Sequence, residues 1–338
     1  MAKNYSSRIQ TDNFFPILLI LLYLCIGFVP NWEAVDKIAP QWLVMSVLNS
    51  ISSLYVGFYL KSYGLSLNVS LRTWVSLIYI SFILWASASY FYAINSTEVI
   101  VNIARQINVF LMFLFMSVFF HKVKSKSILI SYFILTILSI EIYSVLNQAM
   151  EMIESSGYIS SGNLKGVTAN RNITAFSIAI KIPFVLYLLY ISKKNLLKIL
   201  LSLILFSSIL CLTIIESRAA FLALGLILFS YILLNTILFL KSKKSIKALL
   251  VNFYFIIPLL FAVFINQIYY ADKGVDAVSR AATISFGTND GSVNQRLRYY
   301  EDVYNHVVSN PIFGVGLGNW KLKSIEYDNR DITGYIVP

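Results

Sequence analysis

Residues 196–240 read LLKILLSLILFSSILCLTIIESRAAFLALGLILFSYILLNTILFL, two apolar runs that are separated only by the polar residues Glu216, Ser217 and Arg218. A helix needs about 20 mostly apolar residues to cross roughly 30 Å of hydrocarbon, and each run has that length. This stretch therefore predicts two antiparallel membrane-spanning helices that are joined by a very short polar turn.

Similar apolar runs fill most of the remaining chain, which has 338 residues, of which 58% are hydrophobic and only 13% charged. A soluble domain of this composition could not keep so many apolar residues off its surface. The predicted fold class is therefore an all-α polytopic membrane protein with about nine transmembrane helices in residues 1–268 and a partly helical extracytoplasmic subdomain in residues 269–338. The predicted spans are approximately Phe14–Val29, Gln41–Leu60, Trp74–Ile94, Val99–Phe120, Ile128–Ala149, Ile173–Ser192, Leu196–Ile215, Ala219–Leu240 and Ala248–Ile268.

The net charge of +11 follows from basic residues that gather in alternate loops. Lysine clusters at residues 122–126, 193–198 and 241–247 all fall on one side of the nine-span arrangement. By the positive-inside rule that side is the cytoplasm. We therefore expect a cytoplasmic amino terminus, residues after about 269 on the opposite side, and a lipid bilayer instead of a nucleic acid as the partner of the basic residues.

Arg218 is the most informative charge, because it begins the predicted eighth span directly after Ser217, which is a plausible N-cap. A helix N-terminus attracts anions through its unpaired N–H groups and its dipole. The planar guanidinium adds a bidentate partner for phosphate oxygens, which predicts a phosphate or pyrophosphate site. The alternative is an interfacial arginine that snorkels to the membrane surface or pairs with Glu216.

The loop GVTANRNITAF at residues 166–176 places Asn170, Arg171 and Asn172 at the mouth of the predicted sixth span. These side chains could bind sugar hydroxyls or a phosphate, or they could simply cap the helix. Two further charges, Lys181 and Arg105, lie inside predicted spans, where an unpaired charge costs several kcal/mol. We expect each of them to face the interior of the bundle or a wet cavity.

The polar segment after residue 269 contains a predicted helix over Asn294–Val308, because apolar and aromatic residues recur there at helical spacing. Arg296 shares a face with tyrosines and is a candidate for an anionic ligand or for stacking on tyrosine. Arg298 precedes Glu301 and Asp302 by three and four positions, which favours a solvated ion pair.

The glycine-rich sequence PIFGVGLGNW follows this helix at residues 311–320. Gly314, Gly316 and Gly318 favour a tight turn in which the backbone approaches another group closely. His306, on the preceding helix, is a general-base candidate. No cluster of His and Cys with metal-ligand spacing is present in the sequence, so we expect neither a metal nor a cofactor.

Three of these segments together resemble the O-antigen ligase and polymerase superfamily of bacterial envelope glycan transferases. ESRAAFLAL at residues 216–224 resembles the family's Ser-Arg-small-small helix start, and GVTANRNITAF resembles its Asn-rich entry to an earlier span. RLRYYEDVYNHVVSNPIFGVGLGNW at residues 296–320 resembles the outer-loop helix and glycine turn, and it is the most specific of the three.

The resemblance implies a metal-independent glycosyltransferase of the GT-C type in the bacterial inner membrane. The donor would be a glycan on an undecaprenyl pyrophosphate carrier, and the acceptor a lipid A core sugar or another glycan repeat. Arg218 and Arg296 would be the catalytic residues that hold the pyrophosphate leaving group on the periplasmic face. The substrate-binding residues would be Asn170, Arg171, Asn172, Arg298, Gly314 and Gly316.

The family also predicts a catalytic histidine in the outer loop beyond the glycine turn, commonly soon after a Val-Pro pair. Here the sequence stops at Val337–Pro338, so a carboxy-terminal truncation that removes the general base is expected. Two other functions stay open, a lipid-linked oligosaccharide flippase or other transporter, and a non-catalytic scaffold. The informative polar groups gather at the predicted outer ends of the spans, which favours chemistry on the outer face.

Overall fold

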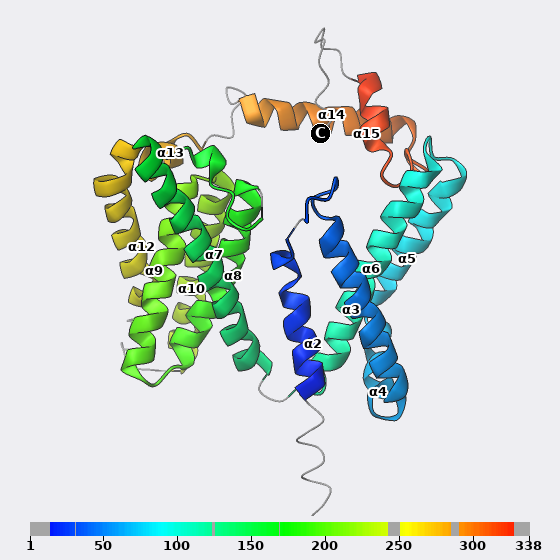
Figure 1. Cartoon of the computed structure of the whole chain (residues 1–338), viewed down its shortest axis with the longest axis horizontal. Helices are drawn as coiled ribbons and strands as arrows, with labels where there is room; N and C mark the ends of the chain where they lie inside the picture. The colour runs from blue at the N-terminus through cyan, green and yellow to red at the C-terminus, as the bar shows by residue number, and fades with distance from the viewer. Residues whose placement is uncertain are drawn as a thin grey trace, which may run out of the picture. The chain divides into compact units, whose positions relative to one another are not determined.

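The computed structural model describes residues 14–30, 32–123, 126–168, 170–242, 251–284 and 291–327, and these ranges contain helices and no strand (Figure 1). The chain divides into two compact units, unit 1 from Met1–Lys124 and Phe286–Pro338, and unit 2 from Ser125–Ser285. The predicted subdomain over residues 269–338 stays a prediction; its described residues 269–284 belong to unit 2 and residues 291–327 to unit 1.

Unit 2 is a bundle of long helices. They are α7 Lys126–Ser156, α8 Arg171–Ile191, α9 Asn195–Ile215, α10 Arg218–Ser242 and α12 Phe253–Ile265. From α12 the chain continues through a π-helical turn η4 Asn266–Tyr270 and a 3-10 turn η5 Ala271–Lys273 to the short helix α13 Ala277–Ala282.

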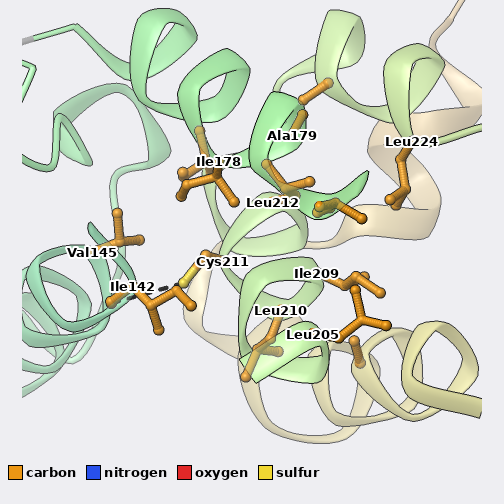
Figure 2. Close-up of a cluster of buried hydrophobic side chains, with 14 of the residues drawn as sticks. Ile142, Val145, Ile178, Ala179, Leu205, Ile209, Leu210, Cys211, Leu212 and Leu224 are labelled. Carbon is orange, nitrogen blue, oxygen red and sulfur yellow. Dashed lines mark hydrogen bonds between the residues drawn. The ribbon is translucent and has the colours of Figure 1, made fainter. Parts of the chain in front are cut away.

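The core of unit 2 is built around α9, which is buried by α7, α8, α10 and α12. Figure 2 shows part of this core, in which the Cys211 thiol donates a weak hydrogen bond of 3.9 Å to the carbonyl oxygen of Ile142. Cys211 is a buried free thiol, as its apolar setting predicts. The labelled core side chains are those of Ile142, Val145, Ile178, Ala179, Leu205, Ile209, Leu210, Cys211, Leu212 and Leu224.

Lys181 lies in the interior of unit 2, as expected for a charge within a span. Its Nζ is 2.9 Å from both carboxylate oxygens of Glu141 on α7, and the Ser177 hydroxyl donates to the same carboxylate at 2.7 Å. The side chains of Lys181 and Glu141 are only 14% and 4% exposed. A charge pair of this kind is the usual way to keep a cation within an apolar bundle.

Unit 1 contains the remaining described helices of the chain. They are α2 Phe14–Leu24, η1 Ile26–Phe28, α3 Ala39–Phe58, α4 Leu60–Leu71, α5 Trp74–Ala88, η2 Ser89–Phe91, α6 Ser96–Phe120, α14 Gly291–Ser309, α15 Trp320–Lys323 and η6 Ser324–Tyr327. Arg105 on α6 does not lie in the bundle interior, which was one of the two places expected for it. It forms a partly exposed ion pair of 2.7 Å with Asp36 and lies 5.6 Å from the centre of the Trp42 ring.

Each of the nine predicted apolar runs contains a helix, which confirms the all-α polytopic class. Within the described ranges seven helices are long and apolar enough to cross a membrane, or eight if α3 and α4 count as one bent span. The predicted count of nine is therefore approximate. The run at Phe14–Val29 has a helix of only 11 residues, and α3 and α4 meet at a bend of 118°.

Candidate functional site

Three polar segments meet at the end of unit 2 where α8 and α10 begin, which we call the arginine end. The loop between α7 and α8 is joined to the chain after η4 by a hydrogen bond of 2.7 Å from the Ile159 N–H to the Lys273 carbonyl oxygen. The turn between α9 and α10 is joined to the start of α8, because the Ser217 hydroxyl donates to Asn172 Oδ1 at 3.2 Å. Two helix N-termini, each with an arginine as first residue, are thus held side by side.

Glu216 is at the centre of the arginine end. It closes α9 in the left-handed conformation with φ of 55°, which costs a residue other than glycine roughly 1–2 kcal/mol. Partial burial raises the pKa of its carboxyl group. A hydrogen bond from Ser161, the positive charges of Arg280 and Arg171, and a hydrogen bond from the Asp276 backbone N–H oppose that increase in the pKa.

Arg280 also belongs to the arginine end, although it was not among the predicted site residues. Its Nε donates to the backbone carbonyl oxygen of Glu216 at 3.3 Å, across 64 positions of sequence. The sequence did contain a signal, because Ser-Arg-Ala-Ala occurs both at residues 217–220 and at residues 279–282.

The placement of Arg280 depends on the start of α13. Asn266, which is fully buried, accepts a hydrogen bond from the Ala277 N–H at 2.9 Å and donates one to the Val275 carbonyl oxygen at 3.2 Å. Asp276 is the N-cap and accepts from the N–H groups of Val278 and Ser279 at 3.0 Å each. These bonds fix the short helix that carries Arg280 towards Glu216.

Asp276 gives a prediction about pH, because hydrogen bonds from Ser279 and Gln267 lower the pKa of its carboxyl group to about 2, against an ordinary 3.8. A carboxyl group whose pKa is lower in the folded state than in the unfolded state stabilises the folded protein when it is ionised. The contribution of Asp276 to stability should therefore be constant above about pH 4 and should be lost as the pH falls towards 2. Amide hydrogen exchange of residues 277–284 as a function of pH measures it, and Asp276→Asn should remove this acid-dependent change.

The structure places Asn170, Arg171 and Arg218 at the starts of α8 and α10. Asn170 caps α8, since its Oδ1 accepts from the N–H groups of Asn172 at 2.9 Å and Ile173 at 3.4 Å, which is the capping role left open by the sequence. Arg171 is half-buried and donates from Nη1 to the Ser161 hydroxyl at 3.2 Å. Arg218 is half-buried at the first position of α10.

The charge at the arginine end favours an anion. Three arginines, Arg171, Arg218 and Arg280, and two carboxylates, Glu216 and Asp276, give a formal charge of +1. The positive ends of the dipoles of α8 and α10 add to that charge. Guanidinium groups and helix N-termini together are suited to phosphate or pyrophosphate oxygens.

Arg296 and Arg298 lie on α14 in unit 1, where the predicted helix is present over Gly291–Ser309. Arg296 is exposed. Arg298 lies 5.5 Å from the centre of the Tyr299 ring, and the structure records no ion pair between Arg298 and either Glu301 or Asp302 within residues 291–327. The expectation of a solvated intrahelical ion pair is therefore wrong for Arg298, and a cation–π contact with the neighbouring tyrosine replaces it.

The glycine turn packs tightly against the connection between α5 and α6 within unit 1. Asn319, which is fully buried, accepts from the Asn95 N–H at 2.7 Å and donates to the Asn95 carbonyl oxygen at 3.2 Å. The Leu317 N–H donates to the Ser89 hydroxyl at 3.0 Å, and the Tyr92 hydroxyl donates to the Phe313 carbonyl oxygen at 2.7 Å. These bonds fix the chain that follows α14.

Two of the glycines are explained by this close packing. A Cβ at Gly316 would lie 2.6 Å from the Ala93 Cβ and 3.2 Å from its Cα, and a Cβ at Gly318 would lie 2.2 Å from the Asn102 side-chain nitrogen. Both have positive φ, of 87° and 77°. Gly314 also has positive φ, of 62°, but a Cβ there would have no atom within 4 Å. A substrate-binding role for Gly314 and Gly316 stays a prediction.

Gly316→Ala should therefore destabilise unit 1 by about 2–4 kcal/mol, from overpacking against Ala93 together with backbone strain. Gly314→Ala is the matched control, because it has the same kind of backbone strain without the clash. Thermal unfolding of the purified variants measures the difference. Equal melting temperatures for the two variants would show that close packing at residue 316 is not the reason for this glycine.

His306 packs α14 against the residues that follow the glycine turn. Its ring lies 5.8 Å from Trp320 and 6.0 Å from Tyr327, measured between ring centres, and its Nδ1 is 3.0 Å from the Tyr327 hydroxyl. Its Nε2 is buried and has no hydrogen-bond partner in the structure. Across the described ranges, no group of three or more His, Cys, Asp or Glu side chains is arranged to hold a metal ion.

Comparison with known proteins supports the family that the motifs suggested. Residues 203–337 match the model of the O-antigen ligase family, which confirms the predicted resemblance for this part of the chain. The matched segment contains Arg218, Arg280, Arg296 and the glycine turn. Searches of curated proteins and of solved structures found no match. The match supports a role in glycan transfer during surface polysaccharide biosynthesis by a multi-pass membrane protein.

Proposed function

We propose that this protein transfers a glycan from an undecaprenyl pyrophosphate carrier to a glycan or lipid A core acceptor on the periplasmic face of the bacterial inner membrane. The observation that carries the proposal is the arginine end of unit 2. There two arginine-bearing helix N-termini are joined by the bond between Ser217 and Asn172, and Arg280 is bound to Glu216. Arg218 and Arg280 both lie in the segment that matches the O-antigen ligase family.

In the proposed reaction an acceptor hydroxyl attacks the anomeric carbon of the donor sugar. The new glycosidic bond forms as the bond between that carbon and the pyrophosphate oxygen breaks, and the hydroxyl proton passes to a general base. Arg218 binds the pyrophosphate and stabilises the negative charge that develops on the leaving oxygen. Arginines supply here the positive charge that a divalent cation supplies at many other phosphate sites, so the proposed reaction needs no metal.

Glu216 has a positioning role in this proposal. Its backbone carbonyl oxygen accepts the bond from Arg280, and its carboxylate lies within electrostatic reach of Arg280 and Arg171. A carboxylate between guanidinium groups reduces their mutual repulsion, which allows several cations to occupy one end of the bundle. His306 is not assigned the general base, because its Nε2 is buried and its ring packs against Trp320 and Tyr327.

Arg296 is proposed as a second residue that binds the pyrophosphate, on the strength of its position in the family motif and its exposure on α14. Arg298 is proposed to contact the substrate beside it. The contact of Arg298 with the Tyr299 ring keeps its guanidinium at the surface of α14 without a bound carboxylate.

The test compares cells that lack the gene with the same cells after the whole protein has been restored. If the protein is a transferase, the cells that lack it should have no surface polymer, and the lipid-linked precursor should accumulate on the outer leaflet. Precursor that accumulates on the inner leaflet would instead support a flippase. Unchanged polymer and precursor would contradict both activities and favour a scaffold.

A further inference from the structure

A second site lies at the other end of unit 2 from the arginines, in a groove between the first half of α9 and α12. The groove has a volume of about 620 Å³. α9 and α12 lie side by side in unit 2 (Figure 1). The lining residues are Asn195, Lys198, Ile199, Ser202, Leu203, Phe206, Tyr254, Ile257, Pro258 and Phe261.

The walls of the groove are apolar and uncovered. Four of its side chains are more than half exposed and belong to helices that are long and apolar enough to span a membrane. They are Ile199, Leu203, Ile257 and Phe261. At the end away from Lys198 the rings of Phe206 and Phe261 lie 5.2 Å apart, measured between ring centres. Such walls match a hydrocarbon chain.

The opposite end of the groove carries a cation. Lys198 Nζ lies 3.4 Å from the Tyr254 hydroxyl and 5.5 Å from the centre of the Tyr254 ring. The structure records no ion pair for Lys198 in the part of the chain that it describes. Lys193 and Lys194 precede α9 directly, so the positive charge continues beyond the groove.

The length of the groove matches one leaflet of a bilayer. Lys198 and Phe206 are eight positions apart on α9, which corresponds to a rise of about 12 Å. Half of the hydrocarbon thickness of a membrane is about 15 Å. The positive-inside rule assigns the lysine end to the cytoplasmic surface, so the groove extends from that surface towards the middle of the membrane.

We propose that this groove binds one anionic phospholipid of the cytoplasmic leaflet. An acyl chain lies between Ile199, Leu203 and the side chains of α12, and the headgroup phosphate contacts Lys198. Lys193 and Lys194 favour a headgroup with net negative charge over a zwitterionic one, because basic residues next to a membrane attract anionic lipids. This lipid is separate from the glycan donor, and the inference does not rest on the proposed transferase activity.

Native mass spectrometry of the purified protein tests the site, with dioleoyl phosphatidylglycerol and dioleoyl phosphatidylcholine as probes. We expect the wild-type protein to retain one phosphatidylglycerol in preference to phosphatidylcholine. Lys198→Gln should weaken that retention about fivefold, while Lys193→Gln, which removes the same charge outside the groove, should have the smaller effect. Ser202→Phe should block retention with Lys198 intact, because it fills the middle of the groove.

Three results would overturn the proposal. Equal retention of the two lipids would show that headgroup charge is not recognised. Equal losses in Lys198→Gln and Lys193→Gln would show general attraction to a basic surface instead of a site. Retention that survives both Lys198→Gln and Ser202→Phe, each confirmed as folded by its melting temperature, would place the lipid elsewhere.

Discussion

Arg218→Ala is expected to lower the rate of glycan transfer on the order of 10²–10³-fold, which is the usual loss when one group that stabilises a leaving-group charge is removed. Arg218 begins α10 next to Glu216, at the end of unit 2 where Arg171 and Arg280 also lie. The charge on the leaving oxygen develops mainly in the transition state. The loss should therefore appear mostly in kcat and only to a smaller degree in KM.

The measurement uses membranes that contain the whole protein, with lipid-linked donor and acceptor supplied. Lys165→Ala is the matched control, because Lys165 is an exposed cation of the loop that leads into α8. The control should retain near wild-type rates, since an exposed charge has little influence at physiological ionic strength. Arg218→Lys should recover only part of the activity, because an ammonium group cannot bind two phosphate oxygens in the plane of a guanidinium. Similar rates for Arg218→Ala and Lys165→Ala would remove Arg218 from the proposed mechanism.

The helical spans could be predicted from sequence because the length of an apolar run is a local property. The run predicted at Leu196–Ile215 is α9 Asn195–Ile215, and the helix predicted at Asn294–Val308 is α14 Gly291–Ser309. The bend of 118° between α3 and α4 could not be predicted in this way. Gly57 lies two positions before Tyr59, where the bend occurs, but a single glycine in an apolar run does not specify a sharp bend. The structure adds the packing of α4 against α6, which joins positions that are distant in the sequence.

The arginine end was predictable only in part, because its key contacts join distant positions. Arg218 and Arg171 were found from their places at the starts of helices, which is a local pattern. Arg280 meets Glu216 across 64 residues, and a single sequence does not show which residues of an outer loop approach a given helix end. The same holds for Asn319, which bonds to Asn95 across 224 residues and fixes the glycine turn.

For the buried pair of Lys181 and Glu141, the sequence shows that the lysine needs a partner, but it does not show the contacts between the two side chains. A lysine within an apolar span needs a partner, and the preceding span contains one carboxylate, Glu141, in its middle. The structure supplies the geometry, with Ser177 bonded to both Lys181 and Glu141. This arrangement gives the largest effect on stability that we expect from a single substitution.

Lys181→Met should destabilise unit 2 by about 3–5 kcal/mol, because it leaves the carboxylate of Glu141 buried without a cation. The double variant Glu141→Leu with Lys181→Met should recover most of that loss, because well-packed apolar residues replace a buried ion pair at little cost or with a gain in stability. Unfolding of the purified variants in a graded series of denaturing detergent measures both. If the double variant is as unstable as Lys181→Met alone, the loss arises from poor packing on α8 and not from the uncompensated charge of Glu141.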